Sequence, residues 1–435
     1  GIYQALMEMP LAMYFYANNS WLPLLATSWS VNVPAATFTV NLRQGVEWSD
    51  GSAFTAKDVV STFYMGYLFK WAIWMYIDSV RAVDDYTVAF HMSKLTNLCE
   101  RFIIREYMRA YNTYGNFSDQ VQTLRAQGKT SADPEMKTLL TQATNYRPTK
   151  LIVTGPFTID VPSITEAEMV LVKNPNSYIA SRVLFDEIRL YQGETAQITP
   201  FVLAKEVDYA THGFPAATIS QFRELGIRVI PADCHSSSGI TFNFAKYPLN
   251  VKEVRQAIAL AVDRKLAGSM PAPAWLPQGD LNYSIPMYNL FAERWVEPDA
   301  LAKLDHYGWE TGGNRTRARL LLLSIGAYID PADGIWTMPN GTKLDFEWVS
   351  QGEYVDVMAI SESCVDQLND FGIKVTLRPI TFTAYLANFR EGKWDLTLGL
   401  GGSSHPHPYY SLYNLYYYSA TFGAGPSIGV NTSEI

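Results

Sequence analysis

The segment that decides the fold is Phe38-Thr-Val-Asn-Leu-Arg-Gln-Gly-Val-Glu-Trp-Ser-Asp-Gly51, followed closely by Thr55-Ala-Lys-Asp58. Residues 37–43 alternate apolar and polar side chains, which is typical of a half-buried strand. Asp50-Gly51 favours a tight turn, because these residue types tolerate a positive φ. Thr55 and Asp58 have the spacing of a capping box, which predicts that a helix begins here. Strand, turn and capped helix in this order indicate an α/β protein.

Similar patterns recur along the chain. Alternating or apolar runs predict strands at 86–92, 158–161, 185–191, 207–210, 239–244, 373–377 and 394–398, and helical spacing predicts helices at 198–203, 251–263 and 361–368. Gly372 is expected to end the last of these helices. The apolar stretch 59–77 is interrupted by Lys70, so we expect a buried amphipathic helix rather than a membrane span. Residues 112–150 permit helix, with breaks at Gly115, Gly128 and Pro134, and residues 271–290 are expected to form a long loop.

The composition excludes several classes of function. The 435 residues include 34 Lys and Arg against 42 Asp and Glu, a net charge of −8, which argues against binding to nucleic acid or to anionic lipid. Only 17% of residues are charged and 14% are aromatic, a balance that suits an extracellular protein, although the rings could equally be core. Asn-X-Ser/Thr sequons give candidate glycosylation sites at Asn18, Asn116, Asn282, Asn314, Asn340 and Asn431.

Motifs for catalysis, metal binding or cofactors are missing from the sequence. Cys99, Cys234 and Cys364 lie more than a hundred residues apart and form no CxxC, so no metal or redox site is expected on them, and their pairing stays open. The sequence contains no HExxH and no P-loop. We therefore expect a binding protein without a cofactor rather than an enzyme. A secreted glycosidase and an adhesive surface-layer protein remain alternatives.

Ten short motifs occur in the order of one known family. They are Leu25-Ala-Thr-Ser-Trp29, the segment 38–51, Thr55-Ala-Lys-Asp-Val-Val60, Thr154-Gly-Pro-Phe157, Asn174-Pro-Asn-Ser-Tyr178, Lys205-Glu-Val-Asp208, Phe242-Asn243, Val254-Arg-Gln-Ala257 with Asp263-Arg264, Gly372-Ile-Lys-Val375 and Trp394-Asp395. Through them the chain resembles the substrate-binding proteins of ABC importers in the oligopeptide, dipeptide and nickel-binding family, solute-binding protein family 5. Some members of that family bind oligosaccharides.

This resemblance implies a two-lobed α/β clamp of the periplasmic-binding-protein kind, which encloses ligand at a hinge and hands it to a membrane permease. We expect residues 1–27 and 151–238 to form the core domain of lobe one, 28–150 an inserted β-rich domain of that lobe, and 239–435 lobe two. The C-terminal return to lobe one is expected outside this chain. The resemblance also implies an extracellular or cell-surface monomer, anchored to the membrane through a segment outside the chain.

The main candidate for ligand contact is the predicted loop Gly399-Leu-Gly-Gly-Ser-Ser-His-Pro-His-Pro408, since glycines let a backbone approach a ligand closely. It lacks the GxGxxG pattern of a nucleotide loop, and His405 and His407, separated by proline, are poor evidence for a metal site. In peptide-binding relatives this loop carries an Asp that pairs with the peptide's α-amino group. The resemblance aligns that position with Ser404, and no acid lies between Asp395 and Glu434.

The missing acid favours a neutral ligand, and we lean to an oligosaccharide over an oligopeptide. Sugars stack on aromatic rings, for which Trp21, Trp275, Trp309, Tyr283 and Tyr409 are candidates. A peptide with a different anchor for its amino group, such as Asp280, remains the alternative. The ligand-binding residues we expect are Trp21, Phe242, Asn243, Trp275, Tyr283, Gly401, Gly402, Ser403, Ser404 and His405, with Phe242-Asn243 at the hinge.

Overall fold

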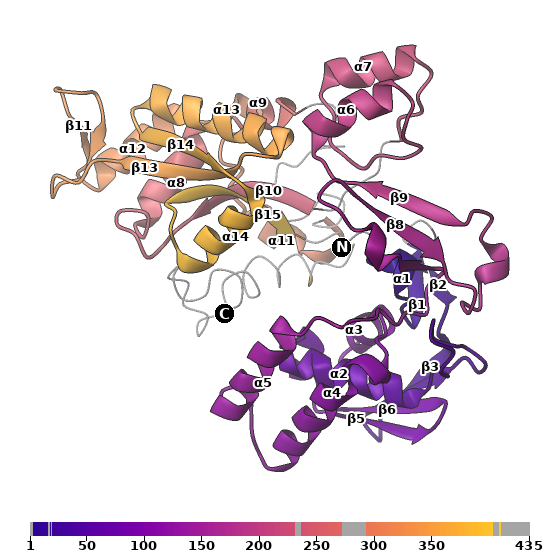
Figure 1. Cartoon of the computed structure of the whole chain (residues 1–435). Coiled ribbons are helices and arrows are strands. Elements are labelled where there is room, and N and C mark those ends of the chain that lie inside the picture. Colours follow the sequence, from indigo (N-terminus) through magenta and orange to yellow (C-terminus); the bar gives the residue numbers. More distant parts are fainter. Residues whose placement is uncertain are drawn as a thin grey trace. The chain divides into compact units, whose positions relative to one another are not determined.

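The computed structural model describes residues 3–15, 18, 20–230, 236–271, 293–402 and 409. The chain divides into two compact units, unit 1 (residues 1–192) and unit 2 (residues 193–435). Each unit has a hydrophobic core of its own. Helices and strands occur together in both, which confirms the expected mixture of α and β structure (Figure 1).

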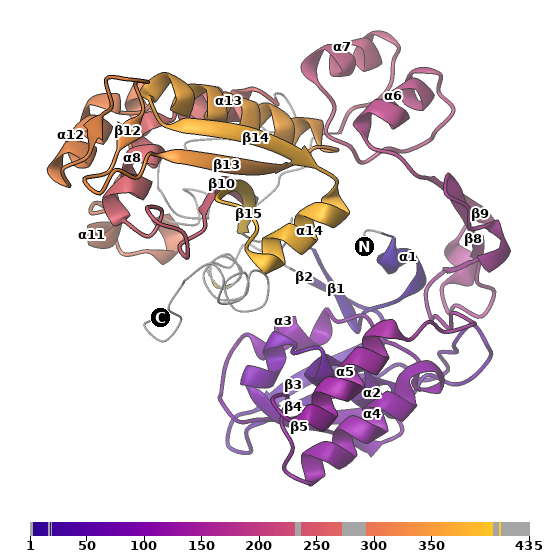
Figure 2. The same ribbon diagram turned by 60° about the vertical axis from the view of Figure 1, so that its left-hand side comes forward.

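Unit 1 is built on a four-stranded antiparallel sheet in the order β3-β4-β6-β5. Its strands are β3 (Ala26–Asn32), β4 (Thr37–Leu42), β5 (Ile77–Asp84) and β6 (Thr87–Met92). Helix α2 (Ala56–Leu68) packs on the sheet, and α4 (Tyr111–Ala126) and α5 (Pro134–Asn145) pack outside α2 (Figure 2). Phe63 of α2 meets Phe90 of β6 edge to face, with ring centroids 4.8 Å apart. The apolar side chains that alternate along the strands therefore pack one face of the sheet against α2.

The capping box at Thr55 is confirmed. The Thr55 amide donates to Asp58 Oδ2 at 2.8 Å, and the reciprocal contact to the Thr55 side chain is also present. The predicted helix, however, ends at Leu68 rather than at 77, because Lys70 adopts a left-handed φ of +58° and the chain turns back. A Cβ on Gly66 would lie 2.3 Å from the Trp71 ring, so glycine permits this return. In the described part of the chain, no helix is long and apolar enough to span a membrane.

The sequence predicted a break at Gly115, but α4 continues through this residue. A Cβ there would lie 2.5 Å from the Tyr111 ring, so glycine allows close packing within the helix. Gly128, with φ +79°, and Pro134, the first residue of α5, do separate α4 from α5 as expected.

The rest of unit 1 consists of short elements around this core. β1 (Ala12–Phe15) and β2 (Ser20–Pro23) form a hairpin, and β7 (Phe157–Ile159), β8 (Glu168–Lys173) and β9 (Glu187–Tyr191) form an antiparallel sheet. Two short helices, α1 (Gln4–Met7) and α3 (Cys99–Ile104), complete the unit.

Unit 2 contains a four-stranded mixed sheet in the order β10-β15-β13-β14. β13 (Asp345–Gln351) runs parallel to β14 (Lys374–Ile380) and to β15 (Leu396–Gly402), while β10 (Ser236–Phe242) is antiparallel to β15. Helices α8 (Lys252–Ala261) and α13 (Val355–Phe371) cover one face, and α14 (Phe382–Glu391) covers the other (Figure 2). Trp348 accordingly belongs to the α8–α13 core and its neighbour Val349 to the α14 side.

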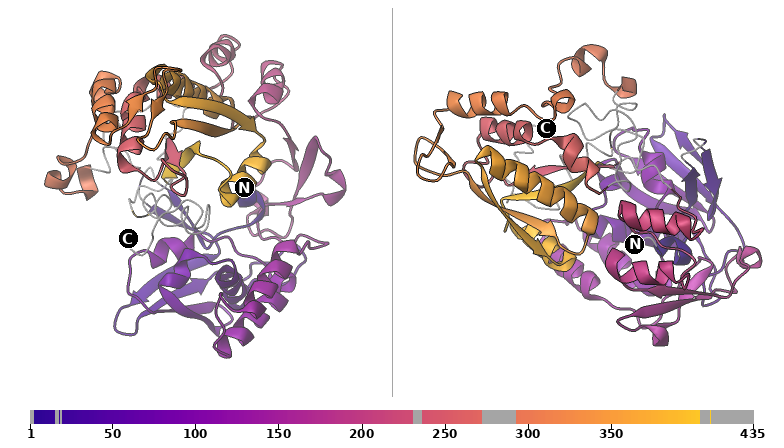
Figure 3. Two further views of the ribbon diagram at one scale, coloured as in Figure 1. Left: turned by 90° about the vertical axis from the view of Figure 1, so that its left-hand side faces the viewer. Right: turned by 90° about the horizontal axis from the view of Figure 1, so that it is seen from above.

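Smaller elements surround this sheet. Helices α9 (Arg264–Ser269) and α12 (Arg315–Ser324) pack on α13 and α8, and α11 (Pro298–Leu301) and the short β11 (Tyr328–Ile329) and β12 (Trp336–Thr337) lie in the same unit. The pair α6 (Thr195–Leu203) and α7 (Ala216–Glu224), side by side in Figure 3, buries its own apolar cluster.

Several sequence predictions for unit 2 are wrong in extent or type. Residues 207–210 form no strand, because no described strand lies beside them and Tyr209 is 78% exposed. The predicted strand 394–398 extends to Gly402, so the residues predicted to open a loop at 399 belong to β15. The helix predicted at 361–368 spans Val355–Phe371 and ends, as expected, at Gly372 with φ +91°. Most of the predicted loop 271–290 lies outside the described residues.

Candidate functional site

The parallel strands of unit 2 end at a common edge of the sheet. β13 ends at Gln351, β14 at Ile380 and β15 at Gly402, and the antiparallel β10 begins there at Ser236. In open α/β sheets, ligands bind outside the carboxyl ends of the strands. We therefore take residues 236–239, 351–354, 380–381 and 399–402, here called the carboxyl edge, as the candidate site.

Small residues fill two neighbouring strands at the carboxyl edge. Ser236, Ser237 and Ser238 pair with Gly402, Gly401 and Leu400, and Gly239 pairs with Gly399. A Cβ on Gly399 would lie 2.1 Å from Thr241 Oγ1, so a larger residue would clash. Glycine at a strand end lets a ligand or another segment approach the backbone closely.

Acidic groups flank the same edge. Glu353 Oε2 accepts from the Phe382 amide at 2.6 Å, which ties the β13 end to the start of α14. Burial raises the pKa of the Glu194 carboxyl, against a lowering effect of His212, and the nearby carboxylates of Glu353 and Asp356 raise it further. Burial also raises the pKa of the Tyr354 hydroxyl. The raised pKa values mean that Glu194 and Tyr354 hold their protons more strongly than usual. The carboxylates on this flank would attract a cationic group of a ligand.

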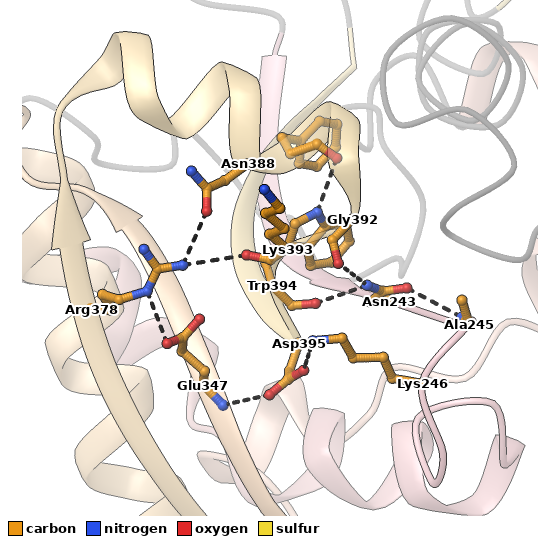
Figure 4. Close-up of polar contacts among 11 residues, drawn as sticks. Asn243, Ala245, Lys246, Glu347, Arg378, Asn388, Gly392, Lys393, Trp394 and Asp395 are labelled. Carbon is orange, nitrogen blue, oxygen red and sulfur yellow. Dashed lines mark hydrogen bonds and ion pairs between the residues drawn. The ribbon is translucent and has the colours of Figure 1, made fainter.

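The opposite end of the β10–β15 pair is closed by side-chain contacts (Figure 4). Asn243 is 1% exposed, and its Nδ2 donates to the carbonyls of Gly392 at 3.1 Å and Trp394 at 2.8 Å. Its Oδ1 accepts from the Ala245 amide at 3.2 Å. The Asn243 amide therefore holds together two segments that are about 150 residues apart in the sequence.

Charged residues form further contacts at the same end of the β10–β15 pair. Asp395 Oδ2 accepts from the Glu347 amide at 2.8 Å, and its Oδ1 pairs with Lys246 Nζ at 2.5 Å (Figure 4). Arg378 pairs with Glu347 at 2.9 Å on the next strands. Asp395 thus joins the start of β15 to β13 and to the segment that follows β10. We call Asn243, Lys246, Glu347, Arg378 and Asp395 the closed-end network.

The structure does not gather all the predicted ligand residues in one place. Gly401 and Gly402 lie at the carboxyl edge, whereas Phe242 and Asn243 lie six residues along β10, on the order of 20 Å away. Trp21 belongs to unit 1, where its ring meets Tyr14 and Trp29 at 5.0 and 5.7 Å. Contact of Phe242 or Asn243 with ligand stays a prediction, and the bonds of Asn243 do not favour it.

Most of the other predicted residues lie outside the part of the chain that the structure describes. Trp275, Tyr283, Ser403, Ser404, His405 and His407 lie outside the described residues. Trp309 lies beneath the cations of Arg264 and Lys265, at 5.2 and 5.1 Å from its ring. The end of β13 and Glu194 were not predicted from the sequence. The alternation of Phe346 and Trp348 with polar neighbours was the available signal for β13.

Comparison with known proteins identifies the family. Residues 21–423 match the family described as bacterial extracellular solute-binding proteins, family 5 Middle. The chain belongs to this family. It is a solute-binding protein of the type that serves ABC importers, which confirms the resemblance seen in the sequence motifs.

Relatives of this solute-binding protein include a probable ABC transporter-binding protein of Deinococcus radiodurans, 22% identical over 91% of this chain and 68% of the relative. A mannohexaose-bound periplasmic oligopeptide-binding protein from Thermotoga maritima has a TM-score of 0.79 at 20% identity, over 99% of this chain and 77% of that one. AppA from Bacillus subtilis, in complex with a nonapeptide, has a TM-score of 0.77 at 18% identity, over 99% and 79%. The periplasmic-binding-protein fold is thereby confirmed.

The two cysteines that the structure describes are buried thiols of low reactivity. Cys99 and Cys364 are free and buried, and burial raises the pKa of their thiols to about 11 and about 12. Cys234 lies outside the described residues. No group of three or more His, Cys, Asp or Glu side chains within the described ranges could hold a metal ion.

The predicted glycosylation sites occupy varied positions. Asn340 lies in an exposed turn, Asn116 on the exposed face of α4, and Asn18 accepts from Ser20 Oγ. Asn314 already caps α12, where its Oδ1 accepts from the Arg317 amide at 2.9 Å. Asn282 and Asn431 lie outside the described residues.

Proposed function

We propose that this solute-binding protein captures a neutral oligosaccharide at the carboxyl edge of unit 2 and delivers it to a membrane permease. The observation that carries the ligand class is Ser404, which stands where the sequence motifs place an acid in peptide-binding relatives. Between Asp395 and Glu434 there is no other acid to replace it.

The energetic argument concerns the peptide's amino group. Enclosing an ammonium without a partner charge costs several kcal/mol, whereas sugar hydroxyls need only neutral donors and acceptors. The backbone of residues 399–402 and of the paired residues 236–239 supplies neutral amides and carbonyls of that kind at the carboxyl edge. The mannohexaose bound by the Thermotoga relative supports an oligosaccharide as ligand.

The second candidate is an oligopeptide, and one observation favours it. Glu353 and Asp356 lie close enough to Glu194 to raise the pKa of its carboxyl, and these three acids on the flank of the carboxyl edge could take the place of the missing acid. The nonapeptide bound by AppA supports this alternative. A peptide would place its amino group beside these carboxylates and gain a charge-assisted hydrogen bond.

Calorimetric titration with manno-, cello-, malto- and xylo-oligosaccharides against peptides of two to nine residues separates the candidates. We expect saturable binding of an oligosaccharide that does not change in Glu353→Gln. Peptide binding that disappears on N-terminal acetylation and weakens in Glu353→Gln, without oligosaccharide binding, would replace the first proposal with the second.

We further propose that the protein binds without catalysis, as a monomer outside the cell, anchored at the membrane beside its permease. Residues 28–150 would then be an insert in the first lobe, and ligand would be enclosed between the lobes. Incubation of a bound oligosaccharide, followed by mass analysis, should return it unaltered. Release of shortened sugar that stops on substitution of a carboxylate would contradict this proposal.

A further inference from the structure

We propose that unit 1 carries a second ligand site, for a free amino acid in its zwitterionic form, in a groove between α2, β5 and α4. The groove has a volume of about 320 Å³, and its lining residues are Lys57, Val60, Ser61, Val80, Arg81, Ala82, Tyr111, Ser118, Asp119 and Gln122. All ten lining residues belong to unit 1, whereas the residues of the carboxyl edge belong to unit 2. The proposal is independent of the nature of the transported ligand.

The three elements that form the groove present one face each. Lys57, Val60 and Ser61 have the i, i+3, i+4 spacing of one side of α2. On α4, Gln122 follows Ser118 by four residues and Asp119 by three, so these three residues also share one side of their helix. β5 is the edge strand of the sheet, so residues 80–82 line the groove from an open edge. A volume near the lower limit of about 300 Å³ for ligand pockets suits a single small molecule.

A polar side chain in the floor lacks a partner. Ser61 is 1% exposed, and its Oγ forms no hydrogen bond with any described residue. Buried hydroxyls are normally paired, because an unpaired one keeps the full cost of its desolvation. Ser118, also buried, accepts from Gln122 Nε2 at 3.3 Å, so Ser61 is the group that a ligand would pair.

Tyr111 contacts a cation at its ring and an anion at its hydroxyl. Lys57 Nζ lies 3.5 Å from the centroid of the Tyr111 ring, and the Tyr111 hydroxyl donates to Asp119 Oδ2 at 2.6 Å. Tyr111 therefore fixes both charges while keeping them from forming an ion pair with each other. Both charged side chains are exposed and retain capacity for a ligand.

This arrangement matches the chemistry of an α-amino acid. Its carboxylate would pair with Lys57, its ammonium would pair with Asp119, and its side chain would lie against Val60, Val80 and Ala82. Arg81 lines the groove as well, so the charged lining residues sum to +1 (Lys57, Arg81, Asp119) in a chain of net charge −8. A molecule that carries only one of the two charges would leave the opposite group without a partner.

Saturation-transfer NMR on the full chain tests the site with L-valine and two matched analogues. 3-Methylbutanoate lacks the ammonium of valine, and L-valinamide lacks its carboxylate. We expect saturable binding of L-valine and binding about tenfold weaker for each analogue. Lys57→Met should weaken L-valine and 3-methylbutanoate but not L-valinamide, and Asp119→Asn should weaken L-valine and L-valinamide but not 3-methylbutanoate.

Ser61→Ala and Lys150→Met complete the test. Ser61→Ala removes the unpaired hydroxyl and should lower the affinity for L-valine several-fold without lowering the melting temperature. Lys150, an exposed lysine elsewhere in unit 1, is the matched control, and Lys150→Met should bind like the wild type. Absence of saturable L-valine binding up to about 10 mM, or equal affinities in the wild type, Lys57→Met and Asp119→Asn, would overturn the proposal.

Discussion

The two ends of the β10–β15 pair are built in opposite ways. At one end, Asn243 and Asp395 use nearly every polar atom of their side chains to join β10, β13 and the turn before β15. At the other end, Gly401 and Gly402 face Ser237 and Ser236, and the strands offer mainly backbone. The same two strands thus carry a closed end and an open end.

This difference separates stability from recognition. Side-chain bonds at the closed end leave little capacity for a ligand, so substitutions there should act on folding. At the open end, Gly401 and Gly402 have no side chain that packs, so substitutions at these two positions should act on binding. Gly399, farther along β15, lies against Thr241, so a substitution there should act on stability. Each of the following changes tests that division, from the largest expected effect to the smallest.

Asn243→Ala should lower the free energy of unfolding by about 2–4 kcal/mol, because the buried carbonyls of Gly392 and Trp394 lose their donor. Urea denaturation measures the loss. Asn41→Ala is the matched control, since Asn41 donates to Ser28 Oγ at an exposed position, and its cost should stay within about 0.5 kcal/mol. Equal costs for both variants would show that the closed end does not stabilise unit 2.

Alkylation of buried thiols shows which unit is destabilised by Asn243→Ala. Burial raises the pKa of Cys364 in unit 2 to about 12 and of Cys99 in unit 1 to about 11, so both thiols are protonated and slow to react near pH 8. In a Cys234→Ser background, Asn243→Ala should accelerate the modification of Cys364 by roughly 30-fold or more, by the free-energy conversion of about 1.4 kcal/mol per tenfold. Cys99 should react as in the parent, and equal acceleration of both would mean that the two units open together.

Gly399→Ala should cost about 1–3 kcal/mol, since its Cβ would lie 2.1 Å from Thr241 Oγ1. Gly239 is directly opposite in the sheet, and nothing lies within 4 Å of a Cβ placed there, so Gly239→Ala is the control and should be nearly neutral. Thr241→Ala combined with Gly399→Ala should recover much of the loss. A double variant no more stable than Gly399→Ala alone would locate the strain elsewhere.

Lys246→Met should have the smallest effect, about 0–1 kcal/mol, because the Lys246 side chain is 44% exposed and its ion pair with Asp395 is screened by water. The cost should fall further in high salt. If thermal melting shows a loss as large as that of Asn243→Ala, the charged part of the closed-end network is more important than its buried amide.

The amino-acid sequence predicted the elements whose local signals agree with their packing. The capping box at Thr55, the turn at Asp50-Gly51 and the terminating Gly372 all depend on neighbouring residues, and all are present. Asp50 Oδ1 accepts from the Ser52 amide at 3.1 Å, as a turn of this type requires.

Local sequence patterns did not predict the features that depend on contacts with a distant segment of the chain. Gly399 appeared to end a strand, but β10 contributes small residues opposite it, and the two glycine- and serine-rich runs pair in register. The partners of Asn243 at Gly392 and Trp394 also lie about 150 residues away in sequence, so local patterns could not reveal these hydrogen bonds. Such pairings cannot be read from local periodicity, since they depend on which strands become neighbours.

Native mass spectrometry of the full chain with an equimolar mixture of manno-, cello-, malto- and xylo-hexaose and unmodified peptides tests the central claim most directly. The wild type and Asn41→Ala should both carry a hexasaccharide. Gly401→Leu should carry none while remaining folded, because a side chain would cover the backbone at the carboxyl edge. Peptide adducts alone, or an equal hexasaccharide adduct on Gly401→Leu, would contradict the account.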